Sequence, residues 1–286
     1  MTTLSVQESG QVGSPSIIFL HGLGVSSWMW HDQVNDLQAD YHCLCVDLPG
    51  NGDSFEQEWI SFEDSARQVA SIIRASATGG TAHVVGLSLG GYVALHLYAN
   101  APELLQTVLV SGITTRPLSG GWLVMKIVAC TRGLLRMKCV LKLAAKGIQL
   151  PDDVVPLFVR DSRRLDALTI TRVYQEVVYF QYPPNLEHVT TTTNSTLPPM
   201  LVVAGTREAS IVVKCLADLP MKLRATGGSK TIVRAAKVPN VHHGWNGEAP
   251  ELFTKMMRLW MTTQELPEEL DSIVLVVPDE PATVSS

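Results

Sequence analysis

Short apolar runs alternate with stretches of helical spacing along the chain as far as Val110. Such runs are typical of strands in a parallel sheet, because both faces of these strands are buried. The runs are residues 17–20, 43–46, 84–87 and 107–110, and the helical stretches that follow the first three are residues 30–37, 61–75 and 89–100. Weak alternation at residues 2–7 marks a candidate edge strand. Regular alternation of strand and helix predicts a parallel β-sheet with helices on both faces.

The pattern changes between residues 113 and 198, where helical stretches dominate. These stretches are residues 122–146, 154–164 and 168–179, and we interpret the whole segment as a helical insertion. Strand and helix signals resume after it. The expected strands are residues 200–204 and 231–233, the expected helices are residues 211–219 and 250–261, and a loop is expected at residues 240–245.

These boundaries divide the chain into three parts. Residues 1–112 and 199–263 form the expected α/β core, a mostly parallel central sheet with helices on both faces. Residues 113–198 form an inserted α-helical cap. Residues 264–286 form an acidic C-terminal tail, which contains six carboxylates and no lysine or arginine.

The third apolar run ends in Gly86-Leu87-Ser88-Leu89-Gly90, and a helical stretch follows at once. Gly-x-Ser-x-Gly between a strand and a helix is the sequence context of a nucleophile elbow. In this sharp turn the serine takes strained backbone geometry, and side chains at Gly86 and Gly90 would collide with neighbouring backbone. The alternative is a glycine-rich turn in which the serine has no chemical role. Partner residues elsewhere in the chain decide between the two.

Other polar loops are expected at the same edge of the sheet as Ser88. His21-Gly22-Leu23-Gly24 follows the first apolar run, and residues 47–54 follow the second. Ligands of parallel α/β sheets bind beyond the carboxyl ends of the strands. A serine hydroxyl needs a base to accept its proton and a third group to orient that base. After the cap segment the chain provides Glu208 and then His242-His243, and the order serine, acid, histidine is that of serine hydrolases on this architecture.

Together these motifs make the chain resemble the α/β-hydrolase superfamily of serine hydrolases with a helical cap, in its esterase and enol-lactonase branch. The resemblance covers about residues 4–262 and is carried by residues 21–24, 47–54, 86–91, 205–208 and 243–250. By position it implies that Ser88 is the nucleophile, Glu208 the acid and His243 the base. It also implies that the backbone N–H groups of Leu23 and Leu89 form the oxyanion hole.

Two of these assignments depend on details of the family pattern. Glu208 stands where the family usually has aspartate, and a longer carboxylate still reaches a histidine. The other family position for the acid, after the fourth apolar run, holds Ser111-Gly112-Ile113 and no carboxylate. In the family the catalytic histidine usually stands five residues before Glu-x-Pro, so Glu248-Ala249-Pro250 selects His243 over His242.

The remaining histidines receive no catalytic role. His21 is expected to bond loop backbone, and His242 to pack or hydrogen-bond beside the base. The others are interpreted as packing or surface residues: His31, His42, His83, His96 and His188.

The resemblance implies a hydrolase that cleaves a carboxylic ester of a small or medium substrate through an acyl-enzyme. The same triad serves lactone hydrolysis, carbon–carbon bond hydrolysis and perhydrolysis, and residues 86–91 are similar to the elbow of enol-lactone hydrolases. A ligand receptor that keeps the hydrolase fold is an alternative of another class. No cofactor or metal is expected, and the expected partner is a small-molecule ester or lactone.

Composition bears on the cellular setting. The net charge of −5 argues against a nucleic-acid binder. The five cysteines lack the spacing of a zinc site and are expected to be reduced thiols of a cytoplasmic protein. The N-terminal residues lack the basic and apolar parts of a signal peptide, and no apolar run reaches the about 18 residues that a membrane span needs. The oligomeric state is not indicated by the sequence.

The cap segment carries an unbalanced charge. Between Glu103 and Asp152 the chain has seven basic residues and no acidic one, with large apolar residues among them. We interpret the basic residues as the solvated face of an amphipathic helix pair. The alternative is a surface that receives an anionic or amphiphilic substrate, or anionic lipid, with the acidic tail as a possible internal counter-charge.

Overall fold

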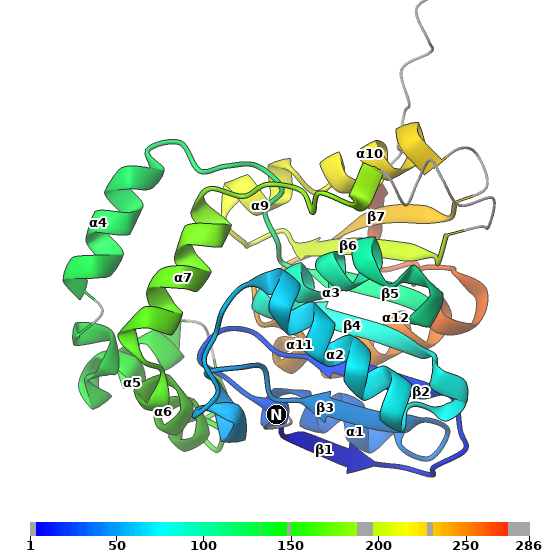
Figure 1. Cartoon of the computed structure of the whole chain (residues 1–286), viewed down its shortest axis with the longest axis horizontal. Helices are drawn as coiled ribbons and strands as arrows, with labels where there is room; N and C mark the ends of the chain where they lie inside the picture. The colour runs from blue at the N-terminus through cyan, green and yellow to red at the C-terminus, as the bar shows by residue number, and fades with distance from the viewer. Residues whose placement is uncertain (1–3, 132, 148–149, 188–196, 228–230, 274–286) are drawn as a thin grey trace, which may run out of the picture.

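Eight strands form one sheet in the computed structural model of the protein, which describes residues 4–131, 133–147, 150–187, 197–227 and 231–273. The strand order is β1-β3-β2-β4-β5-β6-β7-β8 (Figure 1). The inner strands are parallel, and they are β2 (Ser16–Leu20), β3 (His42–Val46), β4 (Ala82–Leu87), β5 (Leu105–Ser111), β6 (Met200–Gly205) and β7 (Val233–Val238). The predicted mostly parallel sheet is therefore confirmed.

The strand register brings the functional loops together. Leu87 pairs with Ser111, and Ser111 pairs with Val203. Gly205 pairs with Val238 on the next strand. The chain thus leaves β4, β5, β6 and β7 at one edge of the sheet, as expected of parallel strands in an α/β fold.

Helices cover both faces of the sheet (Figure 1). One face packs against α2 (Phe62–Ser76), α3 (Leu89–Asn100) and α10 (Asp218–Gly227). The other packs against α1 (His31–Leu37) and α12 (Pro250–Thr263), and Trp260 of α12 donates a hydrogen bond from Nε1 to the carbonyl oxygen of Val108 at 3.1 Å. Two buried clusters result, one on each side, which is why the strands are apolar on both faces.

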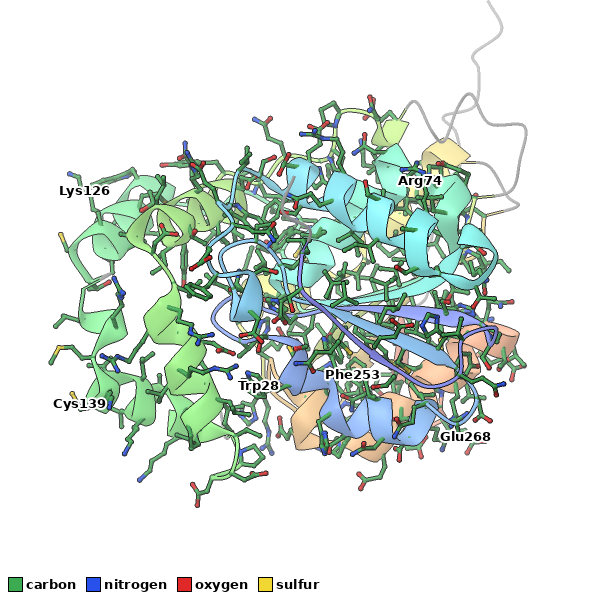
Figure 2. All side chains as sticks on the ribbon, turned by 60° about the horizontal axis from the view of Figure 1, so that its bottom comes forward. Trp28, Arg74, Lys126, Cys139, Phe253 and Glu268 are labelled. Atoms are coloured by element: carbon green, nitrogen blue, oxygen red, sulfur yellow. The ribbon has the colours of Figure 1, made fainter. Side chains whose placement is uncertain are left out.

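Four further helices lie beyond the carboxyl ends of the parallel strands, on the left in Figure 1. They are α4 (Gly121–Thr131), α5 (Lys138–Gly147), α6 (Val155–Arg164) and α7 (Ala167–Val178), and we call them the cap helices. Figure 2 shows Lys126 and Cys139 at their outer edge and Trp28 between them and the sheet. The cap helices lie inside the predicted insertion 113–198, whose status as a separate cap domain stays a prediction.

Helix boundaries follow local chemistry. Ser61 precedes Asp64 by three residues, a spacing that predicts a helix cap, and its Oγ does accept a hydrogen bond from the amide of Asp64 at 3.0 Å at the start of α2. The predicted single helix at residues 211–219 is wrong. The structure has α9 (Ser210–Lys214) and then α10, and at the break the carbonyl oxygen of Cys215 accepts a hydrogen bond from Thr115 Oγ1 at 3.2 Å.

The edges of the sheet differ from the prediction. The first edge strand is β1 (Val6–Ser9), displaced toward the C-terminus and antiparallel to β3. Strand β7 lies at 233–238, and the prediction of 231–233 is wrong. Arg234 and Lys237 interrupt the apolar pattern of the strand, so the sequence did not indicate its full extent. Strand β8 (Asp271–Ile273) lies inside the segment predicted as a tail and pairs antiparallel with β7. Its first two residues are exposed, so the strand has no apolar pattern in the sequence. The rest of that tail, residues 274–286, lies outside the described residues, as do His188 and residues 189–196.

Among the described residues, no helix has both the length and the apolar character required to cross a bilayer.

Candidate active site

Ser88 occupies the turn between β4 and α3. Its backbone angles are φ 57° and ψ −115°, a region that non-glycine residues avoid. A side chain at Gly86 would strike the carbonyl oxygen of Gly90, and a side chain at Gly90 would strike that of Leu20. The two glycines therefore permit a strained turn that costs on the order of 1–3 kcal/mol. Such strain is typical of a nucleophile elbow.

His243 and Glu208 form a contact between two neighbouring loops. Nδ1 of His243 lies 2.7 Å from Oε2 of Glu208. The side chain of Glu208 is 1% exposed, whereas that of His243 is 46% exposed. The other carboxylate oxygen accepts a hydrogen bond from the amide of Gly205 at 2.9 Å. Because an ionised carboxylate only accepts hydrogen bonds, it places the proton of the neutral imidazole on Nδ1 and leaves Nε2 as the acceptor.

The loops that carry this pair are tied to each other. The amide of Arg207 donates to the carbonyl oxygen of Val241 at 3.0 Å, and the amide of Thr206 donates to that of Val238 at 2.9 Å. A side chain at Gly205 would strike the carbonyl oxygen of Val241. The close approach of the loops after β6 and β7 brings the acid and the imidazole within hydrogen-bond distance.

Gly112 provides the space for the imidazole ring. It has φ +69°, and a Cβ atom there would lie 2.7 Å from Cε1 of His243 and 3.3 Å from Oε2 of Glu208. Its amide donates to the carbonyl oxygen of Val203 at 3.0 Å, which fixes its position. The sequence did not indicate this role, because Gly112 stood out only as part of a segment without a carboxylate. A glycine directly after a strand was the signal that could have indicated a close approach of another group.

A cavity of about 430 Å³ brings the candidate residues together. Its lining includes all five residues named from the sequence, namely Leu23, Ser88, Leu89, Glu208 and His243. The remaining lining is mostly apolar and comes from α3, α7 and α9 and from the loop after β5: Tyr92, Gly112, Thr114, Val173, Tyr174, Val177, Ala209 and Val212. The size is within the usual range of small-molecule sites.

The two candidate oxyanion donors, the amides of Leu89 and Leu23, lie next to the ends of regular elements. Leu89 is the first residue of α3, and the first amides of a helix have no acceptor within the helix. Leu23 follows the end of β2, and the amide of Gly90 donates to the carbonyl oxygen of His21 at 3.0 Å. That bond fastens the start of α3 to the His21 loop, which keeps both candidate amides at the same cavity.

His21 has a structural role, as predicted. It is fully buried, its Nδ1 donates to the carbonyl oxygen of Gly22 at 2.7 Å, and its Nε2 accepts from the amide of Leu48 at 2.9 Å. Burial lowers its pKa, although the carboxylate of Asp47 partly opposes this. A neutral His21 therefore links the loops that follow β2 and β3.

The neighbouring His242 is bound to a different carboxylate. Its amide donates to Oε2 of Glu248 at 2.7 Å, and its Nδ1 lies 3.1 Å from Oε1 of the same residue. His242 thus fulfils the expectation of a nearby hydrogen bond. Elsewhere His83 bonds Thr107 at 2.9 Å and His42 bonds Glu8 at 2.6 Å.

The cap helices form hydrogen bonds with the segment that carries Leu23. Oδ2 of Asp161 on α6 accepts hydrogen bonds from Ser26 Oγ at 2.7 Å and Trp28 Nε1 at 2.8 Å. Ser162 Oγ donates to the carbonyl oxygen of Gly24 at 3.0 Å. These contacts could not be predicted from the sequence, because more than a hundred residues separate the partners.

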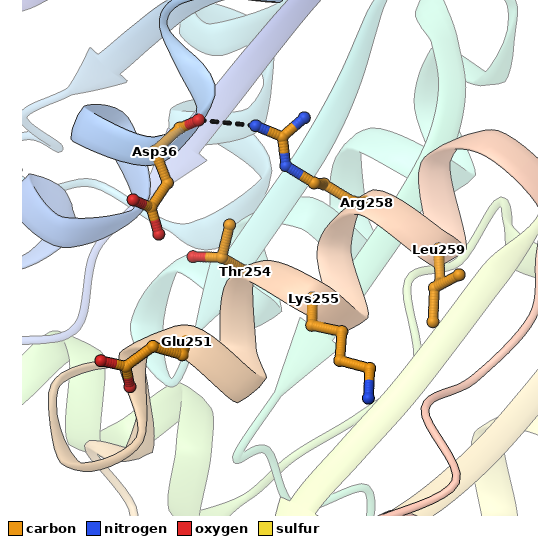
Figure 3. Close-up of a pocket in the computed structure, with 6 residues that line it drawn as sticks. All are labelled: Asp36, Glu251, Thr254, Lys255, Arg258 and Leu259. Atoms are coloured by element: carbon orange, nitrogen blue, oxygen red, sulfur yellow. Dashed lines mark hydrogen bonds between the residues drawn. The ribbon is translucent and has the colours of Figure 1, made fainter.

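A second depression, of about 500 Å³, lies on α12 and shares no lining residue with the first cavity (Figure 3). Its two cations are engaged, since Arg258 bonds Asp40 and the carbonyl oxygen of Asp36, and Lys255 bonds Glu269. It offers an open surface without a serine or cysteine nucleophile or a histidine in its lining. Across the described ranges, no three His, Cys, Asp or Glu side chains gather as a metal site.

The sequence matches the Alpha/beta hydrolase family over residues 17–255. An AB hydrolase superfamily protein of Gibberella zeae is 30% identical over 93% of this chain and 86% of its own length. A pimeloyl-acyl-carrier protein methyl ester esterase of Vibrio parahaemolyticus is 39% identical over 36% of this chain and 37% of that protein. A 3-oxoadipate enol-lactonase of Acinetobacter baylyi is 36% identical over 33% of this chain and 35% of that protein.

Solved structures share the fold at lower identity. The enol-lactonase of Burkholderia xenovorans superposes with a TM-score of 0.67 and 18% identity, over 91% of this chain and 96% of that one. This likeness concerns the architecture alone.

Proposed function

Since the chain belongs to the alpha/beta hydrolase family, we propose that it is a serine hydrolase that cleaves a carboxylic ester of a small or medium substrate. The observation that carries the proposal is the 2.7 Å contact of His243 with the buried Glu208 at the cavity that Ser88 lines. The esterase among the relatives supports an ester as substrate, although its match covers about a third of the chain.

The proposed reaction proceeds in two halves. The Ser88 hydroxyl attacks the ester carbonyl while Nε2 of His243 takes its proton, and Glu208 stabilises the resulting imidazolium. The amides of Leu23 and Leu89 donate to the oxyanion. The alcohol leaves with the proton from His243, and an acyl ester remains on Ser88. Water then attacks the acyl carbonyl while Nε2 of His243 takes its proton, and that proton passes to Oγ of Ser88 as the carboxylic acid leaves.

The cavity favours an uncharged, largely apolar substrate. Among the described residues of its lining, the ionisable groups besides Glu208 and His243 are the phenols of Tyr92 and Tyr174. Burial raises the pKa of both phenols. The Tyr92 hydroxyl is engaged with Thr114, whose amide donates to it at 2.9 Å. A charged acyl group would lose its hydration there without a partner, which is costly.

Lactone hydrolysis is the second candidate, supported by the enol-lactonase relative and by the similar elbow at residues 86–91. It uses the same residues, and the alcohol then stays attached to the acyl group. Carbon–carbon bond hydrolysis, perhydrolysis and ligand reception are less directly supported. The buried thiols of Cys43, Cys45 and Cys215 support a reducing, cytoplasmic setting, and burial raises the pKa of Cys43 to about 12.

The test measures turnover of a panel of short p-nitrophenyl esters and unsubstituted lactones. It compares the wild type with three variants, Ser88→Ala, His243→Ala and His242→Ala. We expect Ser88→Ala and His243→Ala each to lower kcat by at least about a thousandfold, because the triad acts as a unit. His242→Ala is the matched control and should retain most activity. A fluorophosphonate probe should label Ser88 in the wild type, as read by peptide mass spectrometry.

Each alternative has its own result. Turnover of lactones with little turnover of esters would make the protein a lactonase. Saturable ligand binding without turnover of either, and without labelling of Ser88, would favour the receptor. An inactive His242→Ala beside an active His243→Ala would move the base by one residue.

A further inference from the structure

The outer surface of the cap helices exposes large apolar side chains. Trp122 is 61% exposed and Leu143 is 72% exposed. Other exposed apolar residues of this segment are Leu123, Ile127, Leu134 and Met137. We call these six residues, with the basic residues Lys126, Arg136, Lys138, Lys142 and Lys146, the cap face. Several large apolar side chains exposed on neighbouring parts of the cap helices are typical of a site of contact with another phase or molecule.

Helical spacing shows that this exposure is one-sided. In α4 the buried residues are Gly121 and Val128, and a side chain at Gly121 would strike Val178 of α7. The residues that point away from α7 are Trp122, Leu123, Lys126 and Ile127, which all lie on one face of α4. Helix α5 likewise buries Leu141 and Ala145 and exposes Lys142, Leu143 and Lys146 on its opposite side. Figure 2 shows Lys126 and Cys139 along the same outer edge, at the end of the molecule opposite Glu268.

The basic residues of the cap face have no acidic partners. In the part of the chain that the structure describes, no ion pair involves Lys126, Arg136, Lys138, Lys142 or Lys146. By contrast, Arg172 pairs with Glu58, Lys255 with Glu269 and Arg258 with Asp40. Lys126 lies over the Trp122 ring, 4.9 Å from its centroid, so that charge and aromatic surface are presented together.

We propose that the cap face binds the surface of an anionic lipid bilayer. An amphipathic surface with tryptophan and leucine beside lysines fits the boundary between acyl chains and negative headgroups, because both features are then satisfied at once. Two copies of the chain meeting through this face would bring unpaired cations of the same sign together, which disfavours a dimer. Anionic lipid is the occupant that complements both the charge and the apolar area.

Lipid binding by the cap face does not depend on the proposed chemistry. Val173, Tyr174 and Val177 of α7 line the cavity, and α4 packs on α7 from outside. The cap face therefore belongs to the layer next to the cavity wall and contains none of the residues proposed for catalysis. Ser88→Ala should bind vesicles as the wild type does, which separates the two proposals.

The first test measures sedimentation of the full chain with vesicles of phosphatidylcholine and with an equimolar mixture of phosphatidylcholine and phosphatidylserine. We expect at least about tenfold stronger partition onto the anionic vesicles, weakening as salt rises from about 0.05 M to about 0.5 M. Lys138→Glu with Lys142→Glu should remove most of this preference. The matched control is Arg234→Glu, which reverses an exposed charge on β7.

The second test uses tryptophan fluorescence. Trp30, Trp59, Trp245 and Trp260 are fully buried, and Trp28 is bonded to Asp161, so Trp122 is the tryptophan that a bilayer would reach. Quenching by brominated phosphatidylcholine in anionic vesicles should occur in the wild type and be lost in Trp122→Phe. Trp122→Ala should also weaken partition, whereas Val12→Ala, at an exposed apolar residue outside the cap, should not.

Several results would overturn the proposal. Equal partition onto neutral and anionic vesicles, or none onto either, would do so. A concentration-dependent dimer that Trp122→Ala converts to monomer would identify a second copy as the occupant. Binding that appears only after residues 274–286 are deleted would mean that the cap face belongs to the chain's own C-terminal segment.

Discussion

Oδ2 of Asp161 lies 2.8 Å from Nε1 of Trp28, and this contact joins a cap helix to the loop after β2. The Asp161 side chain is 0% exposed, and its other oxygen pairs with Nε of Arg160 at 2.6 Å. The loop that it holds carries Leu23, a proposed oxyanion donor. Together with the bond from Ser162 to Gly24, this buried carboxylate therefore connects the cap helices to the loop that carries Leu23.

Asp161→Asn should weaken this connection. An asparagine amide has one acceptor oxygen, so its NH2 donor must face either the donors Ser26 and Trp28 or the donor Arg160, and we expect a loss of about 1–3 kcal/mol in the free energy of unfolding. Displacement of the Leu23 amide should lower kcat about tenfold or more, with little change in KM. Steady-state kinetics with a p-nitrophenyl ester, well below the melting temperature, measures both constants.

The control for Asp161 is Asp53→Asn. Asp53 pairs with Arg164 of the same helix at 3.2 Å, but it is exposed, and exposed pairs contribute little. Its variant should have normal kcat and stability. If Asp161→Asn also keeps normal kcat while losing stability, Asp161 supports the fold and not the loop position.

Glu208→Gln should preserve the fold and impair catalysis. The amide cannot stabilise the imidazolium or fix the tautomer, so kcat should fall by roughly a thousandfold with KM nearly unchanged. Glu248→Gln is the control, because Glu248 bonds the adjacent His242 instead. Near-normal kcat in Glu208→Gln would assign the third catalytic role to another group, or to none.

The central elements could be predicted because their signals are local. The apolar runs of β2 to β6 and the Ser61 cap of α2 depend on residues that are neighbours in sequence. The elbow at Ser88 is likewise encoded within five residues. The assignment of Glu208 and His243 needed the family resemblance, because their contact spans 35 positions.

The missed features depend on tertiary contacts. The break between α9 and α10 coincides with hydrogen bonds from Thr115, which is distant in sequence. Strand β8 begins with the exposed residues Asp271 and Ser272 and exists through pairing with β7. The role of Asp161 follows from partners on the far side of the cap insertion. The pattern of apolar and polar residues within one segment carries no information about such contacts.

Gly112→Ala should disable the site through the imidazole. The new methyl would lie 2.7 Å from Cε1 of His243, so the ring must move away from its position beside Glu208. We expect kcat to fall by roughly tenfold to a hundredfold, because small displacements of catalytic groups are costly. The positive φ adds a stability cost of about 1 kcal/mol, measurable by thermal unfolding.

Gly120→Ala separates these two effects. Gly120 has φ +71°, close to the +69° of Gly112, but nothing lies within 4 Å of the added Cβ. It should show the same modest loss of stability with normal kcat. Equal activity in the two variants would mean that the imidazole position tolerates the methyl group.

The buried His83 and the half-buried His96 should make the fold sensitive to acid. Burial lowers the pKa of His83 and of His96 from 6.5 to about 4. Between these pH values the unfolded chain binds a proton on each residue and the folded chain does not. Stability therefore falls as the pH falls through this window, by up to about 3 kcal/mol for each residue, and neither contributes a pH dependence above it.

His96→Leu should flatten this decline. The Nδ1 atom of His96 is buried without a hydrogen-bond partner, so a leucine loses no hydrogen bond at that atom, and one titrating group disappears. Urea unfolding between pH about 7 and about 4 should show a smaller loss of stability than in the wild type. His31→Gln, at an exposed position at the start of α1, should leave the wild-type decline unchanged. Parallel pH profiles for wild type and His96→Leu would show that carboxylates and other groups account for the acid sensitivity.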